Sequence, residues 1–318
     1  MSRGRRTVRT WLGAWLLAVV VGSGAACRRG ALPPGPPRFR PEEINGERVL
    51  AEVENFLQFK PRTAGSGGAA RAAEYLEMRL RALDIETVFV DEFTDATPLG
   101  PRTFRNVVGT LPGRADQTIV LVSHYDTKAG VSDTFEGAND GGSSVALLLE
   151  LGRVLRLQAR PGAEIVLAFL DGEECAREYG PQDGLHGSRR LAQTLVRNRR
   201  ADKVKAVIVL DMIGDRNLNV TVPRNGDAAL TRLLLEAASE EGARKHFGLT
   251  RDGGIVTDDH VPFLLAGMPA IDVIDFEYGS APGQNDYWHT PADTLDKLSA
   301  ESLQIVGRVV VRLLNKLP

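Results

Sequence analysis

The sequence predicts a single globular α/β domain with a central, mostly parallel, twisted sheet and helices on both faces. Three observations lead to this fold class. Strand-like and helix-like segments alternate over most of the chain, the strand-like runs are almost continuously apolar, and several end at a glycine or an acidic residue. Such alternation favours a parallel sheet covered on both faces. With 318 residues, 43% of them hydrophobic and 25% charged, the chain is long enough for one large core.

Residues 1–26 have the plan of a secretory signal peptide. Four arginines precede the apolar run Trp11–Val21, and small residues follow it. The run is shorter than the roughly 20 apolar residues that a membrane-spanning helix needs. Cys27 follows two alanines, as at the site where bacterial lipoproteins are cleaved and acylated, although an ordinary cleavage site with a nearby cysteine is the alternative. We therefore expect an exported protein of the bacterial cell envelope, anchored to a membrane through lipidated Cys27.

Residues 27–44 are expected to form a tether between this anchor and a catalytic domain that spans residues 45–318. Five prolines among residues 28–41 exclude a regular hydrogen-bonded element there. Cys175 is the other cysteine, so no internal disulfide forms if Cys27 is lipidated. Without the four arginines of the signal segment, 35 of the 39 basic residues remain against 41 acidic residues. This balance does not predict a nucleic-acid partner.

The periodicity of apolar residues predicts the elements in order. Two amphipathic helices come first, from Asn45 to about Phe59 and after the glycine-rich break at 65–68. Strands and helices then alternate, and the first two strands are expected to pair antiparallel. The predicted strands are Thr87–Phe93, Thr103–Leu111, Ile119–Ser123, Glu164–Leu170, Val204–Leu210 and Ala270–Phe276, and the predicted helices are Ser143–Leu157, Ser188–Arg197, Ala228–Glu241 and a terminal helix ending at Leu317.

Polar residues cluster where these strands end. The apolar strand Glu164–Leu170 runs into Asp171-Gly172-Glu173-Glu174, His124 follows Ile119–Ser123, and Asp211 closes Val204–Leu210. Asp140 lies in a glycine-rich loop before a helix, and His289 lies in a loop before the last helix. Taken singly, an acidic pair in a turn is a solvated surface feature and a lone histidine is a structural one. Because open α/β sheets collect ligands at the carboxyl ends of their strands, together these residues favour a metal site.

The types of residue indicate which metal and what chemistry. Imidazole and carboxylate ligands without cysteine suit a catalytic Zn²⁺ ion, which keeps one coordination position open. A neighbouring carboxylate that does not bind the metal then serves as general acid and base. The pair Glu173-Glu174 supplies both roles, since successive side chains leave a strand end in different directions.

Five motifs in this order resemble the zinc aminopeptidase and glutaminyl cyclase superfamily, which implies a zinc aminopeptidase-like fold. Within that superfamily the chain is more similar to the glutaminyl-peptide cyclotransferases of animal type, through the stretches at 97–100, 104–106, 181–189 and 258–264. The five motifs are Ser-His-Tyr-Asp at 123–126, Gly-Ala-Asn-Asp at 137–140, Asp-Gly-Glu-Glu at 171–174, Leu-Asp-Met-Ile-Gly at 210–214 and Trp-His-Thr at 288–290.

The resemblance implies a role for each matching residue. Asp140, Glu174 and His289 would bind one zinc ion, and Glu173 would carry the proton. Asp258 and Asp211 would complete an acidic network beside Glu173, and Trp288 would wall the substrate pocket. His124 and Asp211 match positions that bind a second zinc ion in the aminopeptidases, so the motifs leave the number of ions open at one or two.

The chain departs from the cyclases at several positions of this pattern. Tyr179 stands at the place of a pocket tryptophan, Gly141 replaces a small hydroxyl residue, and Asp272 stands where a histidine is usual. The segment 277–286 before the last motif is longer than its counterpart. These differences concern the pocket, and therefore the choice of substrate.

The leading hypothesis is an enzyme that cyclises N-terminal glutamine of peptides or proteins to pyroglutamate and releases ammonia. The alternative is a zinc aminopeptidase, in which Glu173 would act as the base for a metal-bound water. A catalytically silent binding module is a third interpretation, against which the intact set of Glu173, Glu174, Asp140 and His289 argues. The products from a peptide that begins with glutamine distinguish the first two hypotheses.

Overall fold

The computed structural model describes residues 39–157, 162–250 and 254–317. The predicted signal peptide and Cys27 lie outside the described residues, as does most of the predicted tether. The end of that tether is packed on the domain, because Phe39 is buried and exchanges backbone hydrogen bonds with the Asn315 side chain at 2.7 Å each. Within the described residues, no helix has the length and apolar character needed to cross a bilayer.

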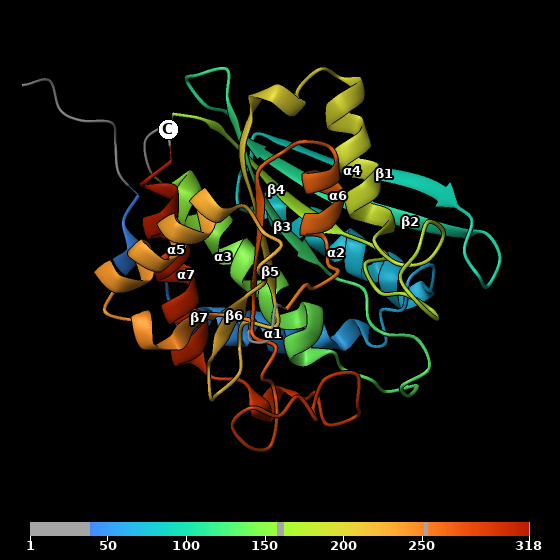
Figure 1. Ribbon diagram of the computed structural model, residues 1–318. Helices are drawn as coiled ribbons and strands as arrows, with labels where there is room; N and C mark the ends of the chain where they lie inside the picture. The colour runs from blue at the N-terminus through green and yellow to red at the C-terminus, as the bar shows by residue number, and fades with distance from the viewer. Residues whose placement is uncertain (1–38, 158–161, 251–253, 318) are drawn as a thin grey trace, which may run out of the picture. The chain divides into compact units, whose positions relative to one another are not determined.

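A six-stranded sheet in the order β1-β2-β4-β3-β5-β8 forms the centre of the domain (Figure 1). The pairs β3–β4, β3–β5 and β5–β8 are parallel, whereas β2 pairs antiparallel with both β1 and β4. The predicted mostly parallel sheet and its antiparallel first pair are thus confirmed. The strands are β1 (Thr87–Asp95), β2 (Arg102–Leu111), β3 (Thr118–His124), β4 (Glu164–Leu170), β5 (Val204–Asp211) and β8 (Ala270–Ile274).

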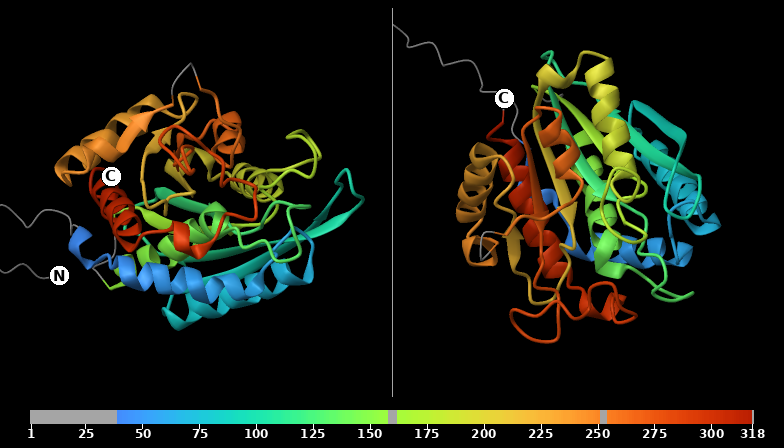
Figure 2. Two further views of the ribbon diagram at one scale, coloured as in Figure 1. Left: turned by 90° about the horizontal axis from the view of Figure 1, so that it is seen from below. Right: turned by 45° about the vertical axis from the view of Figure 1, so that its right-hand side comes forward.

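Helices cover both faces of this sheet (Figures 1 and 2). On one face lie α1 (Gly46–Phe56), α2 (Gly67–Ala82), α3 (Ser144–Arg156) and α7 (Ala300–Leu314), with α5 (Ala228–Glu240) packed on α7. On the other face lie α4 (His186–Arg197) and α6 (His260–Leu265). The terminal helix ends at Leu314, three residues before the predicted end.

Alternation along each strand fills two separate apolar clusters, one on each face. In β4, Ile165, Leu167 and Phe169 face the larger cluster, whereas Val166, Ala168 and Leu170 face the cluster beneath α4 and α6. A strand buried on both faces explains why its sequence reads as a continuous apolar run rather than an alternating one. It also fixes where the strand must end, because Asp171 is the first residue that neither cluster accepts.

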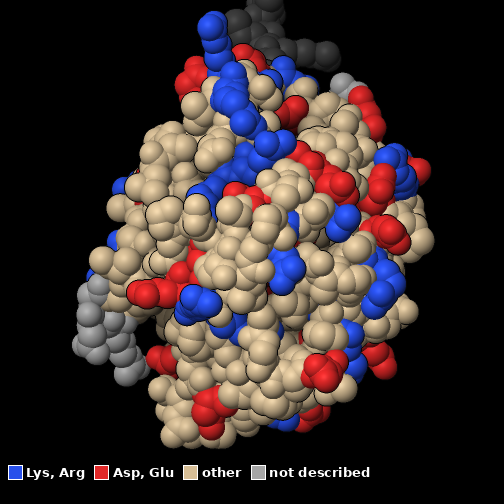
Figure 3. Space-filling model, turned by 90° about the vertical axis from the view of Figure 1, so that its right-hand side faces the viewer, with Lys and Arg blue, Asp and Glu red and all other residues tan. Residues whose placement is uncertain are grey.

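Charges of both signs are interspersed on the face drawn in Figure 3, with a short basic stripe near its upper end. Ion pairs such as Arg190 with Asp91 and Arg200 with Glu164 join α4 and the segment after it to the sheet at 2.8 and 2.7 Å. Surface ion pairs contribute at most about 1 kcal/mol each, so the stability of the domain rests mainly on its buried apolar side chains.

Three short elements escaped prediction. The strands β6 (Val220–Val222) and β7 (Phe247–Leu249) form a separate two-stranded parallel sheet, and α6 has six residues that include Pro262. Three residues do not show a period, and proline argues against a helix except in its first turn, where Pro262 lies.

The strand order places the carboxyl ends of β4, β3, β5 and β8 along one edge. From β3, the chain crosses to β4 on one side and then returns past β3 to β5 on the other. The connection through α3 runs over one face, and the connection through α4 runs over the opposite face. A crevice is expected outside the strand ends where the direction of winding reverses, which here is the end of β3.

Candidate active site

The Glu173-Glu174 pair is shaped by the turn after β4. Gly172 has a φ of +74°, and a Cβ atom on it would lie 2.4 Å from the Phe104 ring, so only glycine fits. The backbone N–H groups of Glu173 and Glu174 then donate to the two carboxylate oxygens of Asp126, at 3.0 and 3.2 Å. One buried carboxylate therefore fixes both amides, and the two glutamate side chains diverge from a defined turn.

The loop that carries Asp140 is held from two sides. Asp293 accepts the N–H groups of Asn139 and Asp140 at 2.7 and 3.2 Å, and the Tyr278 hydroxyl donates to Asp293 at 2.8 Å. Asp140 itself has a non-helical ψ of 97° within the segment Ala138–Ser143, so the backbone bends at Asp140 before the helix that follows begins. Gly141, with a φ of +81°, allows this bend beside His124.

Arg62 connects this loop to the end of β3. Its guanidinium is fully buried and donates to the carbonyl oxygens of Tyr125, Glu136 and Gly137 at 2.8, 2.8 and 3.0 Å. Burial lowers the pKa of Arg62 to about 10, although the nearby Asp293, Asp140 and Asp126 oppose this shift. The side chain thus fixes the two loops that bring Asp126 and Asp140 to the site.

His289 completes a cluster with Asp140 and Glu174. Its Nε2 atom lies 3.0 Å from Glu174 Oε1 and 3.3 Å from Asp140 Oδ2. The residue has a φ of +55°, a conformation that costs a non-glycine residue about 1–3 kcal/mol and is concentrated at functional sites. Burial by itself lowers the pKa of His289, but Asp140 and Glu174 outweigh it and raise this pKa to about 9. The site therefore favours positive charge between the two carboxylates.

These three residues fit a zinc ion. Their ligand atoms lie within 4.8 Å of one another and come from three separate segments of the chain. Asp140 Oδ2 and Glu174 Oε2 are buried and accept no hydrogen bond among the described residues, and only the longer contacts to His289 Nε2 at 3.3 Å and Lys128 Nζ at 3.5 Å reach them, so a bound cation would satisfy both. One imidazole and two carboxylates form a donor set typical of catalytic zinc.

His124, Asp140 and Asp211 form a second cluster of possible ligands. His124 Nε2 lies 3.1 Å from Asp211 Oδ1 and 3.2 Å from Asp140 Oδ1. Burial alone lowers the pKa of His124, but Asp211, Asp126 and Asp140 outweigh it and hold the pKa well above its ordinary value. The structure thus brings both predicted sets together around a shared Asp140.

The predicted acidic network lies on the other side of Glu173. Burial, followed by the charges of Asp258 and Glu174, holds the pKa of Glu173 well above its ordinary value. Burial and the charge of Asp211 do the same for Asp258, and burial and Asp258 do so for Asp272. A carboxyl group whose proton is retained more firmly than usual is suited to accept and return one.

A histidine borders this network. The Asn225 side chain makes two hydrogen bonds to the backbone of Val256. Its Oδ1 atom accepts from the Val256 N–H group, and its Nδ2 atom donates to the Val256 carbonyl oxygen. Nδ2 also lies 3.0 Å from His260 Nε2, which must accept. The proton of neutral His260 is therefore on Nδ1, which lies 4.0 Å from Asp272 Oδ2.

The catalytic candidates open into a cavity of about 250 Å³. Trp288 stacks on His289 at 3.9 Å between ring centroids and contacts Phe276, and Tyr179 donates from its hydroxyl to Glu173 Oε1 at 2.9 Å. Predicted pocket residues Trp288 and Tyr179 both line this cavity. The full lining is Asp140, Glu173, Glu174, Tyr179, Asp211, Ile255, Val256, Thr257, Asp258, Phe276, Trp288 and His289.

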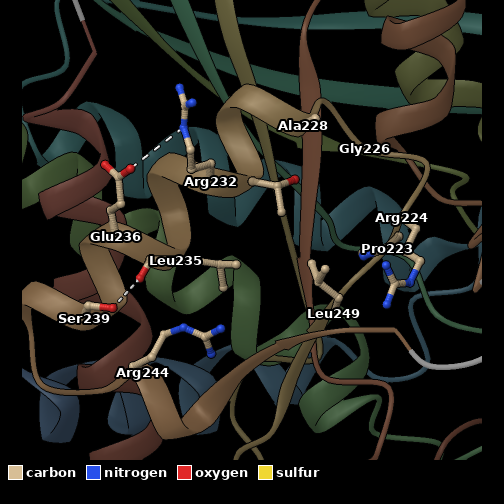
Figure 4. Close-up of a pocket in the computed structure, with 11 residues that line it drawn as sticks. Pro223, Arg224, Gly226, Ala228, Arg232, Leu235, Glu236, Ser239, Arg244 and Leu249 are labelled. Atoms are coloured by element: carbon tan, nitrogen blue, oxygen red, sulfur yellow. Dashed lines mark hydrogen bonds and ion pairs between the residues drawn. The ribbon is translucent and has the colours of Figure 1, made fainter.

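A wider groove of about 500 Å³ lies elsewhere, between α5 and the β6–β7 sheet (Figure 4). It is lined by residues such as Arg224, Arg244 and Leu249, and by none of the predicted site residues. Size alone therefore does not identify the site, whereas the convergence of titratable side chains does.

The sequence did not reveal the residues that hold this site in place. Asp126 was part of a recognised motif but received no role, and Arg62, Asp293 and Tyr278 were not singled out. An aspartate next to a metal-ligand motif is a weak signal for a residue that fixes backbone amides. No local signal points to Arg62, because its three acceptors lie more than 60 positions away.

Comparisons with known proteins agree with this geometry. The model of "Peptidase family M28" matches residues 106–314. The glutaminyl-peptide cyclotransferase-like protein of Bos taurus is 33% identical over 275 residues, which cover 78% of this chain and 70% of the relative. A crystal structure of an Acidobacteriales bacterium glutaminyl cyclase has a TM-score of 0.81 and 35% identity, covering 91% of this chain and 98% of that one.

The fold is shared with peptidases as well. The structure of a Zn-dependent exopeptidase from Parabacteroides distasonis has a TM-score of 0.74 and 26% identity, covering 88% of this chain and 99% of that one. The site's zinc-type donor set agrees with this neighbour. The family model matches about two thirds of the chain, and curated cyclotransferases share 30% identity or more with it. The chain therefore belongs to peptidase family M28 and to the group of that family that contains the glutaminyl-peptide cyclotransferases.

Proposed function

We propose that this enzyme cyclises the N-terminal glutamine of peptides and proteins to pyroglutamate and releases ammonia. The proposal is based on one cavity of about 250 Å³. Four titratable side chains line it beside the rings of Trp288 and Phe276, and these are Glu173, Asp140, Glu174 and His289. A cavity of this size accepts one side chain and the adjacent α-amine. The similarity to glutaminyl cyclases over nearly the whole domain supports the same reaction.

In this reaction the α-amine of the substrate attacks the δ-carbon of its own glutamine side chain. A new C–N bond forms, and the bond to the side-chain NH₂ group breaks. Zinc bound by Asp140, Glu174 and His289 would supply a Lewis acid for the side-chain carbonyl oxygen. Glu173 takes the proton from the attacking amine and returns it to the departing NH₂ group, so no water molecule is consumed.

The protein's own residues adapt the site to this proton transfer. Because burial and the charge of Asp258 raise the pKa of Glu173, the carboxylate is a stronger base than an exposed glutamate. Asp258, which also lines the cavity, repels a second negative charge there. The stacked Trp288 ring covers one face of the His289 ring.

We further propose that one zinc ion acts in the reaction. The cluster of Asp140, Glu174 and His289 opens into the cavity, whereas His124 is 1% exposed and does not line it. An ion bound by His124, Asp140 and Asp211 would therefore be more enclosed than one bound beside His289, although Asp140 and Asp211 also line the cavity. The second candidate function, aminopeptidase activity through two ions, is favoured by one observation, which is that His124 and Asp211 are present and correctly placed.

The products decide between the two functions. Purified, zinc-loaded protein is incubated with matched peptides that begin with glutamine or with leucine, and both are followed by mass spectrometry and an ammonia assay. Cyclisation lowers the mass of the glutamine peptide by one ammonia and leaves the leucine peptide intact. Release of free leucine or glutamine with a shortened peptide would instead establish an aminopeptidase. Glu173→Gln should abolish turnover and retain zinc, whereas loss of zinc would mean that the roles of the two glutamates are exchanged.

Export and lipidation of Cys27 are proposed from the sequence of residues 1–27 alone. Mass spectrometry of the N-terminal peptide from membranes of a bacterial host tests this. An acylated cysteine at the new N-terminus is expected, and Cys27→Ser should release the protein from the membrane. An unmodified peptide with an N-terminus upstream of Cys27 would exclude the lipoprotein interpretation.

A further inference from the structure

We propose that Tyr179 is a positioning residue whose hydroxyl holds the Glu173 carboxylate in the orientation that proton transfer requires. This inference rests on the proposed role of Glu173 as proton carrier, and it concerns a position where the chain departs from the cyclase pattern. Tyr179 Oη donates to Glu173 Oε1 at 2.9 Å. No other hydrogen bond to the Glu173 carboxylate is found among the described residues, so this contact sets the direction of the group.

The tyrosine can do this because its own loop is rigid. Asp183 accepts the backbone N–H groups of Ala176, Arg177 and Glu178 at 2.5, 2.9 and 3.1 Å. Gly180 and Asp183 exchange two backbone hydrogen bonds, at 2.9 and 3.2 Å. These hydrogen bonds tie the residues on either side of Tyr179 together within the loop between β4 and α4.

The ring of Tyr179 is also seated against the backbone next to Glu173. A Cβ atom on Gly184 would lie 2.5 Å from Tyr179 Cδ1 and 2.8 Å from the Glu173 carbonyl oxygen. The same carbonyl accepts the N–H group of Leu185 at 2.8 Å, and the Arg189 guanidinium bonds to the carbonyl oxygens of Gly180 and Gly184. The backbone at Gly184 therefore lies next to both the Tyr179 ring and the Glu173 carbonyl group. This fixes the position of the ring from which the hydroxyl reaches the Glu173 carboxylate.

The hydrogen bond persists in both states of the proton carrier. When Glu173 is a carboxylate, Oε1 accepts from the phenol, and the proton from the substrate amine goes to Oε2. When Oε2 carries that proton, Oε1 is a carbonyl oxygen and still accepts the same bond. Tyr179 therefore need not move during the reaction, and Oε2 is the atom that exchanges the proton. Holding a catalytic group in one geometry raises kcat without changing the affinity for substrate.

The test begins with Tyr179→Phe, which keeps the ring on Gly184 and removes only the hydroxyl. We expect kcat to fall about 10- to 100-fold, the effect of losing a hydrogen bond to a charged group, and KM to stay within about two-fold. Tyr75→Phe is the matched control. Tyr75 also donates to a glutamate, Glu52, at 2.8 Å. It lies on α2 and does not line the cavity, so removal of its hydroxyl should leave kcat unchanged.

A double-mutant cycle separates positioning from a general structural effect. Glu173→Asp keeps a carboxylate but withdraws it from the hydroxyl, so adding Tyr179→Phe should cost less than about two-fold in that background. Full additivity of the two losses, or a rise in KM with unchanged kcat, would overturn the inference, since Tyr179 would then act on the substrate or on the fold. A crystal structure of Tyr179→Phe should show the Glu173 side chain in more than one conformation, and a single unchanged conformation would also overturn it.

Failure of the proposed function gives a different result. If the wild-type protein releases amino acids and cyclises nothing, the same variants are measured on that reaction, because Glu173 carries the proton there as well. Loss of kcat in Tyr179→Phe would then support the positioning role while the cyclase assignment fell. If the wild-type protein cyclises glutamine peptides and Tyr179→Phe is equally active, only the inference about Tyr179 fails.

Discussion

Asp126 Oδ1 accepts the backbone N–H of Glu173 at 3.0 Å, and its second oxygen accepts the next amide along the chain. Asp126 is fully buried and comes from the loop after β3, whereas Glu173 follows β4. The orientation of the acidic pair thus depends on an aspartate that contacts only its backbone.

We predict that Asp126→Asn lowers kcat and destabilises the protein by about 1–3 kcal/mol, because an amide oxygen serves one of the two N–H groups and the NH₂ group opposes the other. Urea unfolding and initial rates measure both effects. Asp227→Asn is the control, because Asp227 caps α5 by accepting two backbone amides and asparagine caps a helix equally well. An Asp126→Asn protein as active and as stable as wild type would contradict this account of the pair.

Gly172→Ala should be far more damaging than Gly242→Ala. Both glycines have a φ of +74°, so both substitutions cost about 1–2 kcal/mol from backbone conformation. A Cβ atom at position 172 also meets the Phe104 ring, which adds about 1–3 kcal/mol, whereas position 242 has nothing within 4 Å. The difference in free energy of unfolding between the two variants measures the contact alone. Equal values would show that the turn before Glu173 relaxes.

His260 should make the protein less stable as the pH falls below 6.5. Burial lowers the pKa of His260 from 6.5 to about 4, so between these values the unfolded chain binds a proton that the folded protein does not. The stability contributed by neutral His260 is complete above pH 6.5 and declines as the pH falls toward 4, by up to about 3 kcal/mol. Free energies of unfolding at pH 7 and pH 4.5 should differ more for wild type than for His260→Gln, and identical pH profiles would refute the shift.

The zinc content of two histidine variants tests the number of ions. Wild type should bind one equivalent by elemental analysis, His289→Gln should bind none under the same dialysis, and His124→Gln should keep its ion. Asp140, Glu174 and His289 all line the cavity, whereas His124 is the one residue of the second cluster that does not. Two equivalents in the wild type, reduced to one by His124→Gln, would favour the aminopeptidase arrangement.

Much of the fold follows from local patterns in the sequence. β4 begins and ends as predicted, at Glu164 and Leu170, because the six buried apolar residues after Glu164 give an apolar run with a sharp end. The short strands β6 and β7 and the helix α6 gave no comparable signal, since their formation depends on neighbours that the sequence does not place nearby. The predicted sets for one and for two ions also come together, because strand ends in a parallel sheet meet at one edge.

The sequence by itself determined which strands form the central sheet and which side chains their ends carry, since both depend on the order of apolar and acidic residues. Only the tertiary structure decided how those side chains are held. Arg62, Asp126 and Asp293 act on backbone groups from distant loops, and Tyr179 reaches Glu173 through a loop closed on itself. Such contacts depend on the spacing between segments rather than on residue type, and spacing exists only once the sheet has brought the strand ends together.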